Sequence, residues 1–308
     1  MEPKVIVIIG PTCSGKTSLS LKIAERINCE IISADSRQVY KLLNIGTAKP
    51  TVAELNQIPH HLIDFLCPDE EYNASKFEKD SLKIISSLLS SNIIPIIVGG
   101  SGLYIKAIID GIFDSVDTDE EFRQKIMQKK NLYGNQFIYD QLLKKDPKTA
   151  STLLPQNWKR IIRALEVLHL TDKPIWKHQE EHRREVNFNF VQFGLEWERE
   201  VLYQNIENRV DEMIGSGLVG EVKNILSKGF KRELNSLNTV GYKEIIDYLD
   251  ENISFGQAVE LIKRNTRRYA KRQLTWFRND ERINWYKISS KNNLDDISEK
   301  IINKFELL

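Results

Sequence analysis

The apolar positions in the first third of the chain form short continuous runs separated by stretches of helical periodicity. Residues 5–9 and 93–98 are almost entirely aliphatic, which is typical of strands buried on both faces of a sheet. Residues 16–27 and 74–91 instead repeat their apolar side chains every three or four positions, which predicts helices. Further strands are expected at residues 30–35, 60–65 and 190–195. Strands that alternate with helices predict a parallel, doubly wound α/β sheet.

The alternation stops at about residue 115, and charged stretches of helical pattern follow until about residue 187. Because a strand of the same sheet is expected afterwards, we interpret residues 115–187 as an all-helical insertion, or lid, that closes over a polyanion. The core would then comprise residues 1–114 and 188–308. Its part beyond residue 196 is expected to be a helical C-terminal region.

A phosphate-binding loop directly follows the first predicted strand. Gly10-Pro11-Thr12-Cys13-Ser14-Gly15-Lys16-Thr17 matches the pattern G-x-x-x-x-G-K-T without a mismatch, in the strand–loop–helix context that the motif requires. Backbone N–H groups of such a loop surround phosphate oxygens, and the helix start adds positive charge. Lys16 would supply a mobile cation, and the Thr17 hydroxyl would bind Mg²⁺. The loop predicts a P-loop NTPase-like fold and a phosphorylated ligand, but not which ligand.

Two side chains are expected at the same edge of the sheet as this loop. Asp35 ends the second predicted strand, and the carboxyl ends of parallel strands face one crevice. A catalytic acid and a helix cap are both open roles for Asp35. The strand at 93–98 ends in glycines and Ser101, which favours close backbone approach to a ligand. His60 and His61 are adjacent on a predicted strand and point to opposite faces, so a structural role is favoured over a metal site.

The composition narrows the setting of the protein. With 308 residues, 41% hydrophobic and 28% charged, the chain has the composition of an ordinary globular protein. Its three widely spaced cysteines predict neither disulfides nor a zinc site. No apolar run approaches the roughly 18 residues of a membrane span, and no signal peptide is recognised. We therefore expect a cytoplasmic protein that does not bind membranes. The expected oligomeric state is a monomer, although no pattern in the sequence determines it.

Positive charge gathers near the C-terminus, although the net charge of the chain is only +1. Arg264, Arg268 and Lys271 would form one stripe along a helix, which is the footprint of phosphate-backbone binding. Up to residue 278, only Glu260 opposes this charge in the nearby sequence, so a merely solvated surface is less favoured. Trp276 and Phe277 could stack on bases, but a place in the core is favoured for both. The basic residues of the region are Lys263, Arg264, Arg267, Arg268, Lys271, Arg272 and Arg278.

Taken together, the motifs resemble those of the tRNA dimethylallyltransferases, also called tRNA isopentenyltransferases. Besides the phosphate loop, the resemblance rests on DSRQVY (35–40), NIGTAKP (44–50), PHHLID (59–64), VGGSGLY (98–104), VGY (240–242) and RYAKRQLTWFR (268–278). They occur in one order over almost the whole chain. Ser101 stands where threonine is common, and Cys13 where a small residue is usual. The chain has no C-terminal zinc-finger pattern, which some eukaryotic relatives carry, so a bacterial-type enzyme is expected.

The resemblance implies transfer of a dimethylallyl group from dimethylallyl diphosphate to the exocyclic amine of an adenine beside the tRNA anticodon, with release of diphosphate. The phosphate loop, Lys16 and Mg²⁺ at Thr17 would hold the diphosphate, Asp35 would be the general base, and Ser101 would assist. Implied tRNA contacts are Asp35, Ser36, Arg37, Gln38 and Ser101, with Arg123, Lys159, Arg160, Ile161, Ile162 and Arg163 in the insertion. Residues 238–243 are a weaker candidate.

Three other functions remain open. A small-molecule kinase could use the same loop for ATP, but it would need no basic helix. A prenyltransferase of free adenine nucleotides would share the fold without the segments that contact tRNA. An RNA-binding module could keep the loop as a scaffold, but it would not need Asp35 at the crevice.

Overall fold

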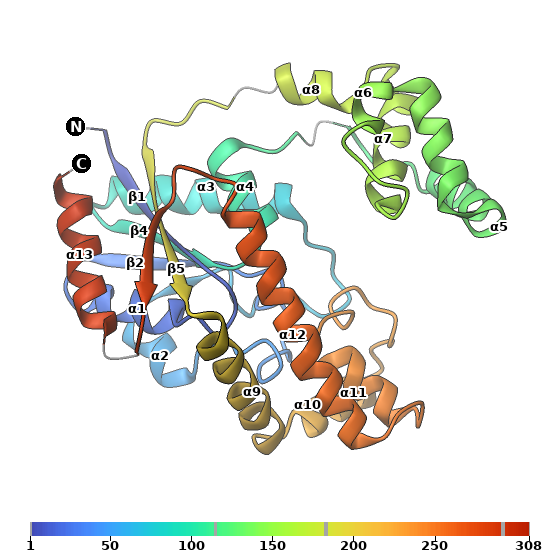
Figure 1. Ribbon diagram of the computed structural model, residues 1–308. Coiled ribbons are helices and arrows are strands. Elements are labelled where there is room, and N and C mark those ends of the chain that lie inside the picture. Colours follow the sequence, from blue (N-terminus) through green and yellow to red (C-terminus); the bar gives the residue numbers. More distant parts are fainter. Residues whose placement is uncertain (1, 114–115, 182–183, 291–292, 308) are drawn as a thin grey trace. The chain divides into compact units, whose positions relative to one another are not determined.

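The computed structural model describes residues 2–113, 116–181, 184–290 and 293–307. It divides into two compact units (Figure 1). The first, which we call the core, comprises residues 1–109 and 186–308. The second, Asp110–Glu185, is the helical insertion. No helix in the described ranges is both long enough and apolar enough to cross a membrane.

The core is built on one parallel sheet with strand order β3-β2-β4-β1-β5-β6. Its strands are β1 (Lys4–Ile9), β2 (Cys29–Ala34), β3 (His60–His61), β4 (Ile94–Gly99), β5 (Asn189–Trp197) and β6 (Asn284–Ile288). Ile6 of β1 is in register with Ile96 of β4 on one side and with Val191 of β5 on the other. These central strands are apolar because both of their faces are covered, as the continuous runs predict.

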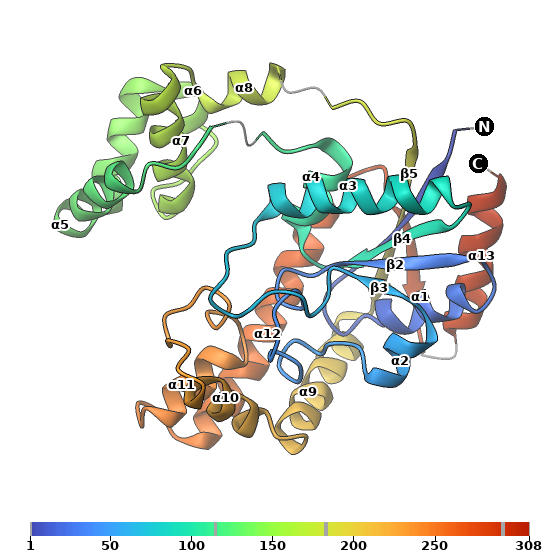
Figure 2. The ribbon, with the colours of Figure 1, turned by 180° about the vertical axis from the view of Figure 1, so that it is seen from behind.

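Helices cover both faces of the sheet. α1 and α13 lie side by side on one face, and α3 and α4 lie on the other (Figures 1 and 2). A second apolar cluster joins the C-terminal helices to Val39, Tyr40 and Leu43, which follow β2. The core helices are α1 (Lys16–Ala24), α2 (Val52–Gln57), α3 (Ala74–Ser90), α4 (Gly102–Asp110), α9 (Arg199–Gly215), α10 (Leu218–Ser227), α11 (Tyr242–Leu249), α12 (Phe255–Phe277) and α13 (Leu294–Leu307).

The helical insertion has its own apolar core. Ile126, Ile138 and Leu142 of α5 pack with Ile161 and Leu165 of α7. The long helix α5 is kinked at Gly134, whose φ of 84° is in the left-handed region that favours glycine. The helices of this unit are α5 (Glu120–Lys145), α6 (Pro147–Ala150), α7 (Trp158–Thr171) and α8 (Ile175–Glu181).

The predicted α/β architecture is confirmed, since a glycine loop joins the carboxyl end of the central strand β1 to α1 in the manner of P-loop NTPase-like folds. Two local predictions were wrong. The strand expected at 60–65 ends at His61, because Leu62 and Asp64 adopt positive φ angles of 59° and 57° that turn the chain. The region beyond residue 196 is not purely helical, because β6 adds a parallel edge strand beside β5.

Candidate functional site

The phosphate loop has the geometry of an anion-binding nest. Cys13 and Gly15 have φ angles of 63° and 87°, and this left-handed backbone curls the loop. Gly15 caps α1 without a side-chain hydrogen bond, so the first N–H groups of the helix remain available to a ligand. Two elements far along the chain fasten the loop: Trp197 donates from Nε1 to the Ser14 carbonyl at 3.0 Å, and Thr12 N–H donates to Oε1 of Gln273 at 2.8 Å.

Lys16 is folded back onto the loop that it serves. Its Nζ donates to the carbonyl oxygens of Gly10 at 3.0 Å and Pro11 at 2.7 Å. Burial lowers the pKa of Lys16 from 10.5 to about 8, and the negative charge of Asp35 opposes part of that shift. The ammonium is therefore poised near Asp35 and gains stabilisation when a phosphate replaces the two carbonyls.

Asp35 caps a turn through one carboxylate oxygen, which is one of the two roles that the sequence left open. Its Oδ1 accepts hydrogen bonds from the backbone N–H of Arg37 at 2.8 Å and of Gln38 at 3.4 Å, and so caps the turn that follows β2. Its Oδ2 has no hydrogen bond to any residue in the described ranges. One oxygen thus fixes the carboxylate while the other is left for chemistry.

Two cavities share the wall that contains Asp35. The first, of about 290 Å³, extends over the phosphate loop and includes Lys16, Thr17 and Gln38. The second, of about 310 Å³, lies against Ser36, Arg37 and residues 238–241. Both are lined by Thr12, Cys13, Asp35, Thr47, Ala48, Arg209 and Tyr269. A ligand bound through phosphate in the first cavity would therefore meet a ligand in the second beside one carboxylate.

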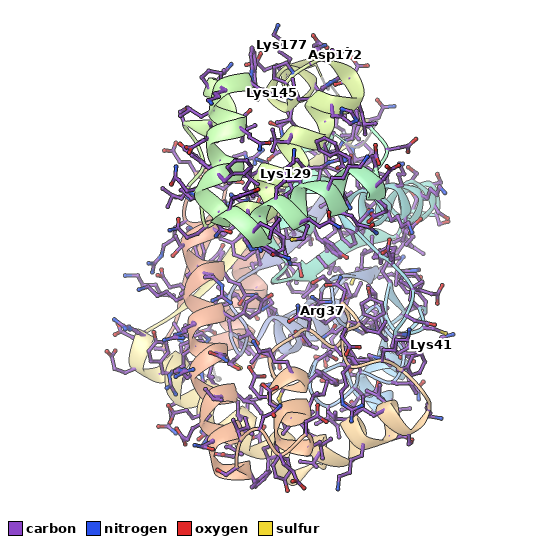
Figure 3. The ribbon with its side chains drawn as sticks, turned by 90° about the vertical axis from the view of Figure 1, so that its right-hand side faces the viewer. Arg37, Lys41, Lys129, Lys145, Asp172 and Lys177 are labelled. Atoms are coloured by element: carbon purple, nitrogen blue, oxygen red, sulfur yellow. The ribbon has the colours of Figure 1, made fainter. Side chains whose placement is uncertain are left out.

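Hydrogen bonds draw the ends of β2 and β4 together at this site. Ser36 N–H donates to Ser101 Oγ at 3.0 Å, which places both predicted residues beside Asp35. Gln38 donates from Nε2 to the carbonyls of Thr47 and Ala48, each at 3.2 Å. Arg37, labelled in Figure 3, donates to the Asn235 carbonyl at 2.7 Å. The predicted core residues are thus assembled at one place.

Arg209 and Tyr269 line both cavities but were missed by the sequence analysis. Arg209 of α9 has no ion pair with any described residue, and its charge acts on Lys16 and Cys13 of the phosphate loop. Burial and the charge of Asp35 raise the pKa of Tyr269 to about 12, so its hydroxyl stays protonated. No local motif marks Arg209, whereas Tyr269 lies inside the motif at 268–278 but was given no role of its own.

The basic stripe of α12 is present but less extensive than predicted. Arg264, Arg268 and Lys271 are exposed and form no ion pair with the described part of the chain. The expectation of uncompensated charge was wrong for three other cations, because acids distant in sequence pair with them: Lys263 with Asp211, Arg267 with Glu207 and Arg278 with Glu196. The aromatic residues also differ, since Phe277 is buried as predicted but Trp276 is 38% exposed.

In the insertion, Arg123 and Arg163 both bind Glu166, which is completely buried. Arg123 Nε lies 2.7 Å and Arg163 Nη1 lies 2.6 Å from the carboxylate. Burial raises the pKa of Glu166, but these hydrogen bonds outweigh it and the net pKa is lowered. Both arginines therefore stabilise the insertion itself, whatever else they bind.

The remaining predicted residues of the insertion divide by exposure. The side chains of Ile161 and Ile162 are buried in its apolar core and cannot reach a ligand. Lys159 and Arg160 are exposed on α7. Further exposed lysines are Lys129, Lys145 and Lys177, labelled in Figure 3.

The two adjacent histidines have structural contacts. Nδ1 of His60 lies 2.8 Å from the Ile58 carbonyl, and His61 Nε2 lies 2.6 Å from Glu30. Among the described residues, no group of three or more His, Cys, Asp or Glu side chains is arranged to hold a metal ion. Both histidines therefore have contacts within the core, and His60 also lines the first cavity.

The fold and this site define a P-loop protein that binds a phosphorylated ligand beside a carboxylate. The IPP transferase family profile matches residues 38–280, and the chain belongs to that family of transferases. It is 46% identical to the tRNA dimethylallyltransferase of Pelotomaculum thermopropionicum over 97% of this chain and 95% of the relative. It is also 46% identical to that of Carboxydothermus hydrogenoformans, over 98% and 97% of the two chains.

Solved structures give the same result. A tRNA isopentenylpyrophosphate transferase from Bacillus halodurans is similar with a TM-score of 0.73 and 40% identity, over 99% of this chain and 97% of that chain. A eukaryotic dimethylallyltransferase described as acting on tRNA is similar with a TM-score of 0.83 and 28% identity, over 98% of this chain and 79% of that chain.

Proposed function

We propose that this protein transfers the dimethylallyl group of dimethylallyl diphosphate to the exocyclic amine of an adenine beside the anticodon of tRNA. Diphosphate is the second product. The observation that carries the proposal is Asp35, which stands on the wall common to the phosphate-loop cavity and the second cavity. A phosphorylated prenyl donor and a purine acceptor can occupy these cavities and meet at Asp35. Family membership supports this assignment.

In the donor cavity, the bond between the allylic carbon and the diphosphate oxygen breaks, and its electron pair leaves with diphosphate. Charge then accumulates on the leaving group. The N–H groups of the phosphate loop and the start of α1 are placed to stabilise that charge. Lys16 would exchange its carbonyl partners for phosphate oxygens, and Arg209 would add a second cation.

In the acceptor cavity, the adenine amine attacks the allylic carbon and must lose one proton. We assign this proton to Oδ2 of Asp35, because Oδ1 is occupied by the turn that follows β2. Ser101 contributes by holding Ser36 and the end of β2 in place. Tyr269 remains a neutral hydroxyl at neutral pH and closes the wall between the cavities.

The first cavity fits a magnesium ion, with the hydroxyl of Thr17 as its protein ligand. The Thr17 hydroxyl lines this cavity and makes no hydrogen bond to any residue that the structure describes. One protein hydroxyl together with phosphate oxygens and water is the coordination that Mg²⁺ commonly adopts in nucleotide sites. When bound, the ion would neutralise charge on the diphosphate.

The exposed cations of both units support tRNA as the acceptor. Arg264, Arg268 and Lys271 form a continuous exposed stripe on α12, and Lys159 and Arg160 are exposed on α7. Such cations bind the RNA backbone through counterion release. The reacting adenine would have to leave its stack to enter the second cavity.

The test is a reaction of purified protein with dimethylallyl diphosphate, Mg²⁺ and unmodified tRNA, followed by mass analysis of the digested nucleosides. We expect one adenosine to gain the prenyl mass. A parallel reaction with free adenine nucleotides distinguishes the nucleotide prenyltransferase, and one with ATP alone distinguishes the kinase. Modification of free nucleotides but not of tRNA would overturn the proposal.

A further inference from the structure

One loop forms part of the walls of both cavities. Residues 44–48 lie between β2 and α2; Gly46, Thr47 and Ala48 line the second cavity, and Thr47 and Ala48 also line the first. The carbonyls of Thr47 and Ala48 accept hydrogen bonds from Gln38, whose own N–H reaches Asp35. The position of this loop therefore affects the shape of both cavities next to the reacting groups.

A single carboxylate from a distant helix holds the loop. Oε2 of Glu221, on α10, accepts from the backbone N–H groups of Asn44 at 3.0 Å and Ile45 at 2.8 Å. Oε1 accepts from Gly46 N–H at 3.2 Å and from the Tyr242 hydroxyl at 2.6 Å. Four donors thus converge on one charged acceptor, which makes strong hydrogen bonds.

The ring of Tyr242 packs closely against the same loop. A Cβ at Gly46 would lie 2.4 Å from Cε2 of Tyr242 and 3.0 Å from Cδ1 of Leu218, so only glycine fits there. Tyr242 is fully buried, and burial together with the charge of Glu221 raises its pKa, so the hydroxyl stays a donor. Gly46 and Tyr242 belong to the two motifs NIGTAKP and VGY, to which the proposed mechanism assigns no role.

A second segment that lines this cavity, residues 238–241, is fixed in a similar way. Gly241 N–H donates to Oε2 of the buried Glu244 at 2.8 Å. Asn265 of α12 donates from Nδ2 to Oε1 of the same carboxylate at 2.8 Å. Residues 238–241 are thereby attached to α12, while Tyr242, next in the chain, reaches Glu221 and the loop at 44–48.

From these contacts we infer that Glu221 is a positioning residue for the proposed transfer reaction. Through the loop at 44–48 and Tyr242 it fixes two adjoining segments, residues 44–48 and 238–241, that line the cavity that would receive the adenine. Glu221 lines neither cavity, so it acts without touching either substrate. The inference depends on the proposed function only for the identity of the ligand, because the geometry that it describes can be measured without turnover.

The experiment compares Glu221→Gln and Tyr242→Phe with a matched control, Glu233→Gln. Glu233 is exposed and has no ion pair with any described residue, so its variant makes the same charge change without disturbing the loop. Hydrogen exchange of the amides of residues 44–46 is measured first. We expect clearly faster exchange in Glu221→Gln, a smaller increase in Tyr242→Phe, which loses one of four hydrogen bonds, and no change in the control.

Steady-state kinetics then separate positioning from general damage. We expect Glu221→Gln to lower kcat/KM for tRNA by about tenfold or more, since small displacements of reacting groups are costly. The dissociation constant of inorganic diphosphate should stay within about twofold, because its proposed partners are the phosphate loop, Lys16 and Arg209, none of which contacts Glu221. Tyr242→Phe should again lie between wild type and Glu221→Gln.

Two results would overturn the inference: wild-type exchange and kinetics in Glu221→Gln, or a parallel loss of diphosphate binding and thermal stability, which marks a purely structural residue. If the wild-type protein itself transfers no prenyl group to tRNA, the proposed function fails. The hydrogen-exchange comparison then still decides whether Glu221 and Tyr242 position the loop.

Discussion

At the scale of single residues, the two oxygens of the Asp35 carboxylate have different surroundings. Asp35 uses Oδ1 to cap the turn after β2, and Oδ2 has no hydrogen bond to any described residue. The two roles that sequence reasoning treated as alternatives are therefore compatible, because a carboxylate has two acceptor atoms. The choice of substitution at Asp35 therefore decides whether one role is lost or both.

Asp35→Asn keeps an acceptor for the Arg37 and Gln38 amides but cannot take a proton. We expect its kcat to fall by about 10²- to 10⁴-fold, with diphosphate and tRNA affinities retained. Asp35→Ala removes the cap as well and should unfold more easily by about 1 kcal/mol. Rapid-quench transfer assays and thermal melts of both variants check this. Wild-type turnover in Asp35→Asn would exclude Asp35 as the base.

Lys16 predicts a pH dependence of diphosphate binding. In the free protein its pKa is lowered to about 8, and a bound diphosphate would raise it. Below pH 8 the ammonium is already present, so affinity contains its full contribution. Above pH 8 binding must take up a proton, so affinity should fall by up to about tenfold per pH unit.

Titration calorimetry of inorganic diphosphate from pH 7 to 10 measures this effect. Lys16→Gln serves as the control, because it keeps the titration of diphosphate itself but has no ammonium to protonate. The affinity ratio of wild type to Lys16→Gln should decline above pH 8. A ratio that stays constant over this range would contradict the assignment.

At the scale of elements, the sequence predicted what apolar runs and motifs encode. β1, β4 and the phosphate loop lie where they were expected, because a strand buried on both faces must be continuously apolar. β6 has the sequence NWYKI, and only its last residue is buried. An edge strand of this kind carries no apolar run, so its pattern did not distinguish it from a loop.

The candidate site was predictable where a motif spans it and not where the fold brings distant residues together. Arg209 reaches the phosphate loop from the middle of α9, which shows only ordinary helical periodicity. The acids that neutralise Lys263 and Arg267 also come from α9, more than 50 positions earlier in the chain. Counting charges along α12 alone therefore overestimated the positive charge that this helix presents to a ligand.

The corrected stripe on α12 predicts how tRNA binding responds to salt. Arg268→Glu with Lys271→Glu removes two exposed cations that have no acidic partner, so affinity should fall and the salt slope should decrease by about 2 units. The matched control is Lys79→Glu with Lys83→Glu, which makes the same reversals on α3. Filter binding at several salt concentrations compares them. Equal losses in both pairs would mean that the stripe has no special part in binding.

At the scale of the whole molecule, the chain consists of two units with separate apolar cores. The insertion interrupts the core between α4 and β5, and contacts divide the chain at residues 109 and 186. The sequence analysis placed the division at residues 115 and 187, where the strand pattern stops and resumes. The first of these predicted boundaries, residues 114 and 115, lies outside the described residues.

Because the two units have separate apolar cores, we expect the core to bind diphosphate without the insertion. Replacing residues 110–185 by a short Gly-Ser linker should leave a folded core that binds inorganic diphosphate with affinity within about threefold of wild type, since every residue lining the two cavities belongs to the core. Transfer to tRNA should fall by at least about 10²-fold. Circular dichroism, calorimetry and the nucleoside assay test this, and full activity without the insertion would remove it from tRNA recognition.

The hydrogen bond between Thr12 and Gln273 has a consequence for turnover. The Thr12 amide of the phosphate loop already donates to Gln273 of α12 before any substrate binds. The Gln273 side chain also donates to the Gly100 carbonyl at 2.9 Å. An incoming diphosphate must either bind with one donor fewer or pull that amide away from the helix. The affinity of the phosphate loop for the leaving diphosphate can therefore be changed through α12, the helix that carries the exposed cations.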